Sequence, residues 1–154
     1  MLPAWQNEWN NIIRYVIFQD ETLKTLMKIP TGTSILTFLD KHFIETGIAD
    51  ETLSSEDVRI IYGDFHSEGL IPHFLKQQLS FDIYVKKSEL RNATKDRLML
   101  RTHLIANRLN ALLTKKDDPN LGGFVFRVIG ETSLGTSLIG YTRYNITFEY
   151  KRTT

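Results

Sequence analysis

The sequence contains no cysteine, and this absence excludes several functional classes at once. Without thiols the chain has no disulfide framework, no cysteine-based zinc site and no thiol nucleophile. The N-terminal stretch has no basic region and no long apolar run, so we expect neither a signal peptide nor a membrane span there. Internal repeats, heptad runs and low-complexity tracts are also missing. We therefore expect a cytosolic product without a membrane partner.

Recognisable catalytic motifs are missing as well. The sequence has neither a His-Glu-x-x-His helix nor a Gly-x-Ser-x-Gly nucleophile elbow. Residues 130–137 have the glycine spacing of a phosphate-binding loop, but Thr136 stands where that loop needs its lysine. The segment also leads into a strand, whereas a phosphate loop must open a helix whose N-terminus faces the anion. We therefore expect no cofactor and no enzymatic activity.

The overall composition is that of an ordinary globular protein. The 154 residues are 42% hydrophobic and 24% charged, which predicts one domain spanning residues 1–154. The net charge is +1, but residues 1–57 hold 4 basic and 9 acidic side chains, whereas residues 58–154 hold 15 and 9. This segregation can steer an anionic partner, place unlike edges of neighbouring copies together, or simply reflect a solvated surface.

The most strongly patterned stretch is a helix predicted over residues 96–114. Leu100 and Leu104 form an i,i+4 pair on the side opposite its core stripe, which makes them candidate contacts with a second partner. A basic edge runs beside them and is a candidate for contact with phosphates or with a neighbouring subunit, the alternative being a solvated helix edge. The core stripe contains Leu98, Thr102, Ile105, Leu109, Leu112 and Leu113, and the basic edge contains Arg97, Arg101, Arg108 and Lys115.

Residues 1–57 are predicted to be mainly helical. A first helix follows Pro3 through residue 18 and carries Trp5 and Trp9 on one face, where paired tryptophans indicate core or interface. Asp20 is predicted to cap a short second helix that ends at Ile29-Pro30. Residues 34–46 are predicted to form a third helix that Gly47 ends, although the preceding Gly32 can equally open a strand.

Residues 58–154 are predicted to form a sheet with the residue 96–114 helix packed on it. Strands are expected at 58–63, 79–86, 124–129 and 138–151; alternation in the second and last gives each one apolar face. The 124–129 strand is apolar on both sides, which predicts an interior position. A long, mobile docking loop is expected between the last two strands, comprising Glu131, Thr132, Ser133, Leu134, Gly135, Thr136 and Ser137.

These elements describe an α+β domain. Its predicted architecture is a single mixed or antiparallel sheet, a central amphipathic helix on one face, N-terminal helices and a long C-terminal β-hairpin. The best catalytic-looking group is Asp64, His66 and Glu68 with His73 nearby, because residues two apart on a strand share a face and can offer oxygen and imidazole ligands. The alternative is a polar loop leading into Gly69, and we expect no metal site.

The order of these elements resembles the tail-terminator or tail-completion proteins of long-tailed bacteriophages. The likeness rests on the strand at 58–62, the alternating strand at 79–85, the helix at 96–113 and the aromatic final strand ending in Tyr144-Asn-Ile-Thr-Phe-Glu-Tyr150. It covers most of the chain from Val58 onward. The acidic helices within residues 20–46 depart from the simplest form of this pattern.

The resemblance implies a non-enzymatic virion protein at the head-tail junction, made in the host cytoplasm. Such a subunit forms a ring, commonly a hexamer, that caps the tail tube and joins it to the head connector or stopper protein, with DNA passing through the lumen. Trp5, Trp9, Leu100 and Leu104 would then serve as subunit contacts, and the basic edge would face either DNA or a neighbour. The alternatives are another neck component such as a head-tail adaptor, a small protein-binding adaptor domain, or a metal-dependent hydrolase.

Overall fold

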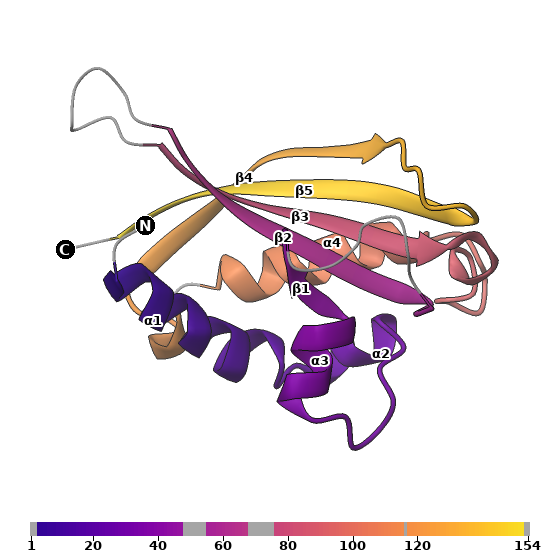
Figure 1. Cartoon of the computed structure of the whole chain (residues 1–154), viewed down its shortest axis with the longest axis horizontal. Helices are drawn as coiled ribbons and strands as arrows, with labels where there is room; N and C mark the ends of the chain where they lie inside the picture. The colour runs from indigo at the N-terminus through magenta and orange to yellow at the C-terminus, as the bar shows by residue number, and fades with distance from the viewer. Residues whose placement is uncertain (1–2, 48–54, 68–75, 116, 153–154) are drawn as a thin grey trace.

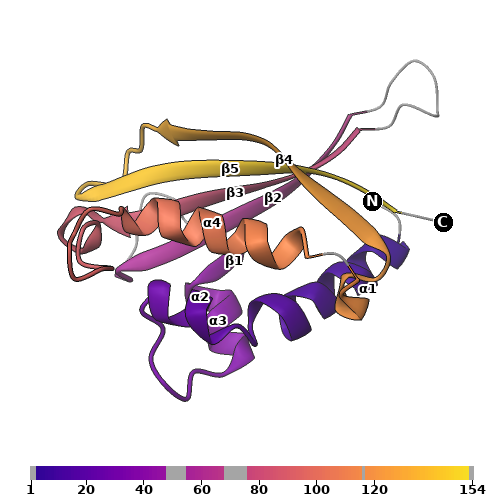
Figure 2. The ribbon, with the colours of Figure 1, turned by 180° about the vertical axis from the view of Figure 1, so that it is seen from behind.

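The computed structural model describes residues 3–47, 55–67, 76–115 and 117–152. They form one five-stranded mixed sheet with helices on one of its faces, as Figures 1 and 2 show from opposite sides. The α+β class, the single sheet and the C-terminal hairpin are therefore confirmed. The helical elements are α1 (Pro3–Ile12), the π-helical η1 (Ile13–Ile17), α2 (Glu21–Leu26), α3 (Ile35–Lys41), the 3₁₀ turn η3 (Lys87–Glu89), α4 (Arg101–Leu113) and the 3₁₀ turn η4 (Pro119–Leu121); the strands are β1 (Phe43–Glu45), β2 (Val58–Ser67), β3 (Lys76–Lys86), β4 (Phe124–Leu134) and β5 (Tyr141–Arg152).

The strand order in the sheet is β1-β2-β3-β5-β4. β1 is parallel to β2, and every other neighbouring pair is antiparallel. β5 therefore lies between β3 and β4. The β4–β5 ladder contains an irregularity between Val128 and Gly130, so the side chains beyond it change faces relative to the first half of β4.

The alternating patterns of β3 and β5 place one apolar face on the helices. Leu79, Phe81 and Ile83 are fully buried, as are Ile146 and Phe148 on β5. Aromatic rings continue this contact across the whole covered face, with centroid distances between 5.1 and 6.4 Å for neighbouring rings. The series runs Phe18, Phe38, Phe43, Phe81, Phe148 and Phe126.

Trp9 belongs to this core. It is 7% exposed, and its ring lies 5.5 Å from that of Tyr62 and 6.3 Å from that of Phe81. The structure therefore shows the core role of Trp9, and its assignment to a subunit contact remains a prediction. The side chain of Trp5 lies outside the described residues.

The predicted helix over residues 34–46 ends early. Ser34 caps α3 by accepting a hydrogen bond from the Thr37 amide, but the helix ends at Lys41. The next residues form β1, where Phe43 pairs with Ile60 and is fully buried. Pairing with β2 satisfies the backbone groups while burying both Phe43 and Ile44, so tertiary packing overrides the helical spacing.

The central helix begins later than its pattern predicts. Asp96 accepts a hydrogen bond from the Leu98 amide, and Arg97 has a φ of 60°, which a right-handed helix cannot include. α4 therefore starts at Arg101, and Leu98 is 76% exposed rather than part of the core. The rest of the stripe is confirmed, because Thr102, Ile105, Leu109 and Leu113 are buried and Leu112 packs against the core.

β4 is an edge strand, not an interior one. Val125 is 47% exposed and Ile129 is 42% exposed, so the residues pointing away from the helices are open to solvent. The strand also extends to Leu134, which places the first residues of the predicted docking loop inside the ladder with β5. The connection itself is confined to residues 135–140. Apolar character on both sides of this strand marks an open edge here, not burial.

Two of the leucines that the stripe assigns to the core, Leu98 and Leu109, can be distinguished by one matched pair of substitutions. We expect Leu109→Ala to lower the free energy of unfolding by about 2–5 kcal/mol, because it leaves a cavity among fully buried side chains. Leu98→Ala should change it by less than about 0.5 kcal/mol. Urea unfolding followed by circular dichroism measures both, and an equal loss from both variants would contradict the placement of Leu98.

Candidate interaction surfaces

Arg101 is buried and bonded to other parts of its own chain, although the sequence pattern predicts it on a basic surface edge. It is 5% exposed, and its guanidinium donates to the carbonyl oxygens of Glu89 at 2.9 Å and Leu26 at 2.7 Å, and to the side-chain oxygen of Asn92 at 2.7 Å. These bonds join α2, the connection after β3 and the start of α4. Arg101 is therefore unable to face DNA or a neighbour.

Arg108 is also occupied within its own chain. Its Nε and Nη2 donate to the two carboxylate oxygens of Asp20 at 2.8 and 2.6 Å, a forked ion pair between α4 and the N-terminus of α2. The same carboxylate accepts the Leu23 amide at 2.8 Å, which confirms Asp20 as the helix cap. Hydrogen bonds from Arg108 lower the pKa of Asp20, outweighing the effect of burial.

A further group of ion pairs surrounds Lys28. Lys28 lies 3.1 Å from the carboxylate of Asp57 and 2.9 Å from that of Glu89, and Lys86 lies 3.3 Å from Asp57. The Asp57–Lys86 and Asp20–Arg108 pairs each join an acid of residues 1–57 to a base of residues 58–154, so part of the charge segregation along the chain is matched inside the subunit. Of the predicted basic edge, Arg97 precedes α4 and Lys115 follows it, both exposed, so the four residues do not form one surface stripe.

Leu100 and Leu104 lie at the start of α4. Leu100 is the extended N-cap residue, and the amide of Leu104 donates to its carbonyl at 3.1 Å. Both side chains are half-buried, so they are not a fully open apolar face. Leu100 lines a hollow of about 350 Å³ with Leu134, Gly135 and Thr136 from the predicted docking loop. Their role as subunit contacts remains a prediction.

The same end of the molecule brings together His103, Tyr144 and Glu131. The His103 and Tyr144 rings meet edge to face, with centroids 4.6 Å apart. Burial raises the pKa of Tyr144, and the charge and hydrogen bond of Glu131 raise it further. The sequence contains no pattern linking these three residues, because the β4 irregularity is what turns Glu131 towards the helix side.

The sheet face opposite the helices carries a connected polar network. Its residues alternate with the core residues of β3 and β5, and the described helices all lie on the other side (Figures 1 and 2). Five residues form it through hydrogen bonds: Arg143 to Asp82 at 2.8 Å, Asn145 to Asp82 at 2.9 Å and to Ser80 at 2.7 Å, Thr147 to Asn145 at 2.8 Å, and Ser80 with Thr147 at 3.1 Å. We call this surface the polar face; the sequence indicates its polarity, but not the bonding that orders it.

One end of the polar face is apolar. Ile61, Tyr84, Leu138 and Tyr141 form a small buried cluster there, separate from the main core. The guanidinium groups of Arg59 and Arg143 lie 5.5 and 5.9 Å from the centre of the Tyr84 ring. Ile139, in the connection between β4 and β5 (residues 135–140), is 94% exposed.

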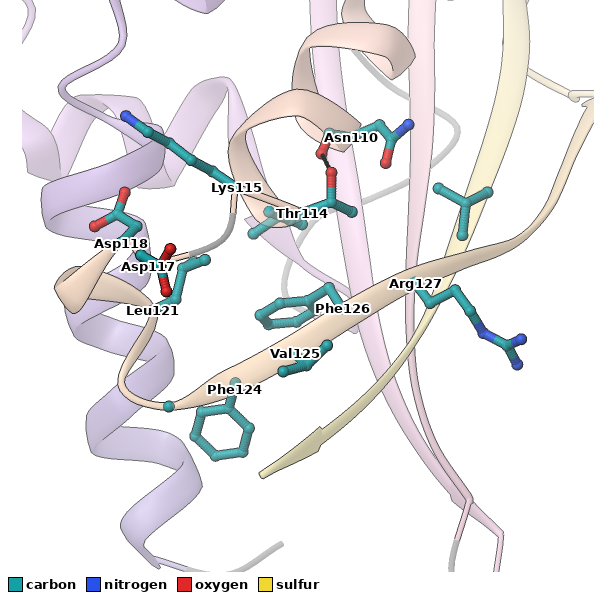
Figure 3. A pocket seen from close by; sticks show the side chains of 13 residues that line it. Asn110, Thr114, Lys115, Asp117, Asp118, Leu121, Phe124, Val125, Phe126 and Arg127 are labelled. Atoms are coloured by element: carbon teal, nitrogen blue, oxygen red, sulfur yellow. Dashed lines mark hydrogen bonds between the residues drawn. The ribbon is translucent and has the colours of Figure 1, made fainter. Parts of the chain in front are cut away.

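A groove of about 700 Å³ lies between the end of α4, η4 and the first half of β4 (Figure 3). Its apolar lining includes Leu113, Leu121, Phe126 and Val128. Charged residues of both signs also line it: Lys115 and Arg127, and Asp117 and Asp118. Arg127 itself is paired with Glu149 at 2.8 Å. The sequence reasoning missed this groove, because it forms only when a helix end and an edge strand meet.

The four residues that the sequence analysis weighed as metal ligands lie largely outside the described part of the structure. Glu68 and His73 are not described, and neither are the side chains of Asp64 and His66 on β2. Among the residues that are described, no three His, Cys, Asp or Glu side chains are grouped to hold a metal ion. Within the same described ranges, no helix has the length and apolar character to cross a membrane.

The buried position of Arg101 makes a prediction that a surface position does not. Arg101→Lys keeps the charge but cannot make three directed hydrogen bonds, so we expect the free energy of unfolding to fall by about 3 kcal/mol. Arg97→Lys is the matched control on the exposed side and should change it by less than about 0.5 kcal/mol. The midpoints of urea unfolding of the two variants test this prediction, and equal midpoints would contradict the buried, hydrogen-bonded position of Arg101.

The Asp20–Arg108 pair predicts a pH dependence. Because the folded-state pKa of Asp20 is lowered, its stabilisation is complete at neutral pH and is lost as the pH falls below about 4. Asp20→Asn keeps a good helix cap but loses the ion pair, and should cost about 1–2 kcal/mol at pH 7. Unfolding curves at pH 7 and pH 3 should show the gap between wild type and variant closing in acid; an unchanged gap would contradict the pairing.

The fold and these surfaces can be set beside known protein families. The YomW family model matches residues 10–150, from α1 to near the end of β5. No curated protein matches the chain. YomW is a family of the Bacillus phage SPbeta region, which agrees with the phage origin that the element order implies. Since the match spans nearly the whole sequence, the chain belongs to the YomW family, a phage-associated protein family.

Proposed function

We propose that this protein is a structural subunit of the phage particle that forms a closed ring at the head-tail junction. The ring caps the tail tube and joins it to the head connector, with DNA passing through its lumen. Membership of a phage-associated family supports the setting. The observation that carries the proposal is the polar face, an ordered surface that no described helix covers, beside an edge strand with exposed apolar side chains.

A closed ring needs two different patches on each subunit, because every copy contacts its neighbours head to tail. The polar face and the open edge of β4 are two such patches. They differ in chemistry: one is a hydrogen-bonded network, and the other presents Val125 and Ile129 beside an apolar groove. A subunit with two unlike patches contacts one neighbour through each patch, so all subunits of the ring point in the same direction around it.

The polar face is also suited to a subunit that must stay soluble before assembly. Its side chains are half-buried, and hydrogen bonds within the subunit already hold them in place. A preorganised polar surface loses little conformational entropy when a partner covers it. It does not bury charge without a partner, because the charges of Arg143 and Asp82 are already matched.

Passage of DNA through the lumen does not depend on the basic edge predicted from sequence. Arg101 and Arg108 are used within the subunit, so a contact with DNA phosphates would fall to exposed residues such as Arg97 and Lys115. Such contacts would be few and dependent on salt.

The second candidate is a protein-binding adaptor, either another neck component or a domain that works as a monomer or dimer. The groove beside β4 favours it, because an apolar groove next to a free strand edge accepts an extended segment from a partner. In this case the polar face would remain open to solvent.

Electron microscopy of labelled particles tests the ring proposal. We expect a tag on this chain to appear at the head-proximal end of the tail, and particles made without the chain to show heads detached from tails that are overlong or unjoined. If particles assemble normally without the chain and carry no label, the virion proposal is wrong. A label elsewhere in the neck would favour the adaptor.

A further inference from the structure

The connection between β3 and α4 carries a group of exposed basic side chains. It begins with η3 and lies at the end of the sheet, beside the turn between β4 and β5 (Figures 1 and 2). The Lys87 amide donates to the Gly140 carbonyl at 2.9 Å, which fixes the start of the connection against that turn. The exposed bases of this stretch are Lys87, Arg91, Lys95 and Arg97, and we call these four residues the basic loop.

The two acidic residues of the same stretch are bonded within the chain. The carboxylate of Glu89 lies 2.9 Å from Nζ of Lys28. Asp96 accepts the Leu98 amide at 3.1 Å and the Thr94 hydroxyl at 2.9 Å. The hydrogen bonds from Lys28 and from the Leu98 amide lower the pKa of Glu89 and of Asp96, respectively. Both carboxylates are therefore charged at neutral pH, but donors of their own chain lie against them.

The bases are not matched in this way. Within the part of the chain that the structure describes, no member of the basic loop forms an ion pair with a carboxylate. Arg91 donates to the carbonyl oxygen of Arg97 at 3.4 Å, so these two bases lie next to each other. The net charge of residues 87–97 is +2, and the charge of Glu89 is already matched by Lys28. The stretch therefore presents unmatched positive charge to solvent.

The backbone of the basic loop is held in one conformation. Arg97 has a φ of 60°, and its amide donates to the Thr94 carbonyl at 3.3 Å. From the buried side, the guanidinium of Arg101 donates to the Glu89 carbonyl and to the side-chain oxygen of Asn92. A loop that is ordered beforehand loses less conformational entropy on binding than a flexible basic tail does.

The hollow next to the basic loop has a lining that suits an anion. Its volume is about 350 Å³, and among the described residues that line it none is acidic. Lys87 and Arg143 line it; the charge of Arg143 is matched by Asp82, so Lys87 supplies the unmatched charge. Ser133 and Thr136 add hydroxyl groups, which commonly donate to phosphate oxygens.

We propose that the basic loop, with the adjoining hollow, contacts the phosphate backbone of double-stranded DNA without reading its sequence. This inference rests on the proposed ring, in which DNA passes through the lumen, and it names the surface that meets the DNA. Exposed Lys and Arg side chains supply contacts of this kind. Residues 87–100 contain no aromatic side chain that could stack on unpaired bases, so a duplex suits this surface better than a single strand.

The rival partner is an acidic surface of another protein. Leu98 is 76% exposed and Met99 is 43% exposed, and apolar side chains beside bases are common in protein interfaces. A protein partner would therefore use Leu98 together with the bases, whereas phosphates attract the bases alone. The two partners accordingly make different predictions for Leu98→Ala.

The salt dependence of DNA binding tests the proposal. The full chain is titrated into a fluorescently labelled duplex of mixed sequence, and anisotropy is measured at several salt concentrations. We expect the logarithm of the association constant to fall with the logarithm of the salt concentration with a slope of about −3 to −4, since each phosphate contact contributes about −0.9. Kd should stay within about twofold for a duplex of different sequence, because phosphate contacts carry no sequence information.

A matched pair of double variants locates the contact. Lys87→Gln with Lys95→Gln should raise Kd at least about tenfold at low salt and make the slope shallower by about 2, because two phosphate contacts are lost. Lys41→Gln with Lys151→Gln removes two exposed lysines elsewhere and changes the net charge equally, so Kd should rise less than about threefold. Equal urea midpoints for the two variants check that both keep the fold.

Three outcomes would overturn the proposal. The first is a wild-type chain that does not bind the duplex at the lowest salt concentration. The second is an equal loss of affinity in the two double variants, because net charge alone would then explain the binding. The third is a Lys87→Gln and Lys95→Gln variant that binds DNA normally while it and Leu98→Ala both block the joining of heads to tails; the basic loop would then meet an acidic protein. With DNA as the partner, Leu98→Ala leaves Kd for the duplex unchanged within about twofold.

Failure of this inference can be told from failure of the proposed ring. A label at the head-tail junction, with DNA binding that does not depend on the basic loop, would remove this contact and leave the ring proposal standing. Binding of DNA through the basic loop, without a label on particles, would leave a DNA-binding protein that acts elsewhere.

Discussion

The continuous series of aromatic rings on one face of the sheet is the contact on which the rest of the structure depends. Phe43, Phe81 and Phe148 carry it from one strand to the next, and Phe38 extends it into the helical part. Large rings bury much apolar area and prefer tilted or edge-to-face contact, which holds neighbouring elements at defined angles. Because this face is buried within the subunit, the surfaces that the described residues leave for partners are the opposite sheet face, the outer edge of β4 and the outer sides of the helices.

The sequence predicts the fold well wherever a pattern of apolar and polar residues fits only one kind of structure. Alternation in β3 and β5 has only one physical reason, a sheet with one buried face, and the predicted bounds of both strands differ from the observed ones by at most three residues. The prediction fails where two different structures produce the same pattern of residues. Apolar residues on both sides of β4 fit an interior strand and an open edge equally, and helical spacing at Phe43 gave way to pairing with β2.

The candidate sites show the same division. The polar face was visible as alternating polar residues, because one-sided burial dictates where polar side chains go. The four basic residues do not form one surface edge, because helical arithmetic gives the direction of a side chain but not what an arginine meets. Arg101 contacts two oxygen atoms from the connection before α4 and one from the distant α2, and Arg108 contacts the carboxylate of Asp20. The groove needs a helix end, a turn and a strand edge together, and no local pattern encodes such a meeting.

The position of β5 has a consequence for how the protein is made. β5 lies between β3 and β4 in the sheet but follows both of them in the sequence, so neither ladder can form until its residues have been synthesised. Until then β4 has no partner among the described strands, and the apolar side chains of β3 lack the neighbours that later cover them. Folding on the ribosome is therefore delayed until residues 141–152 emerge, and the waiting chain is a natural client for chaperones that bind exposed apolar strands.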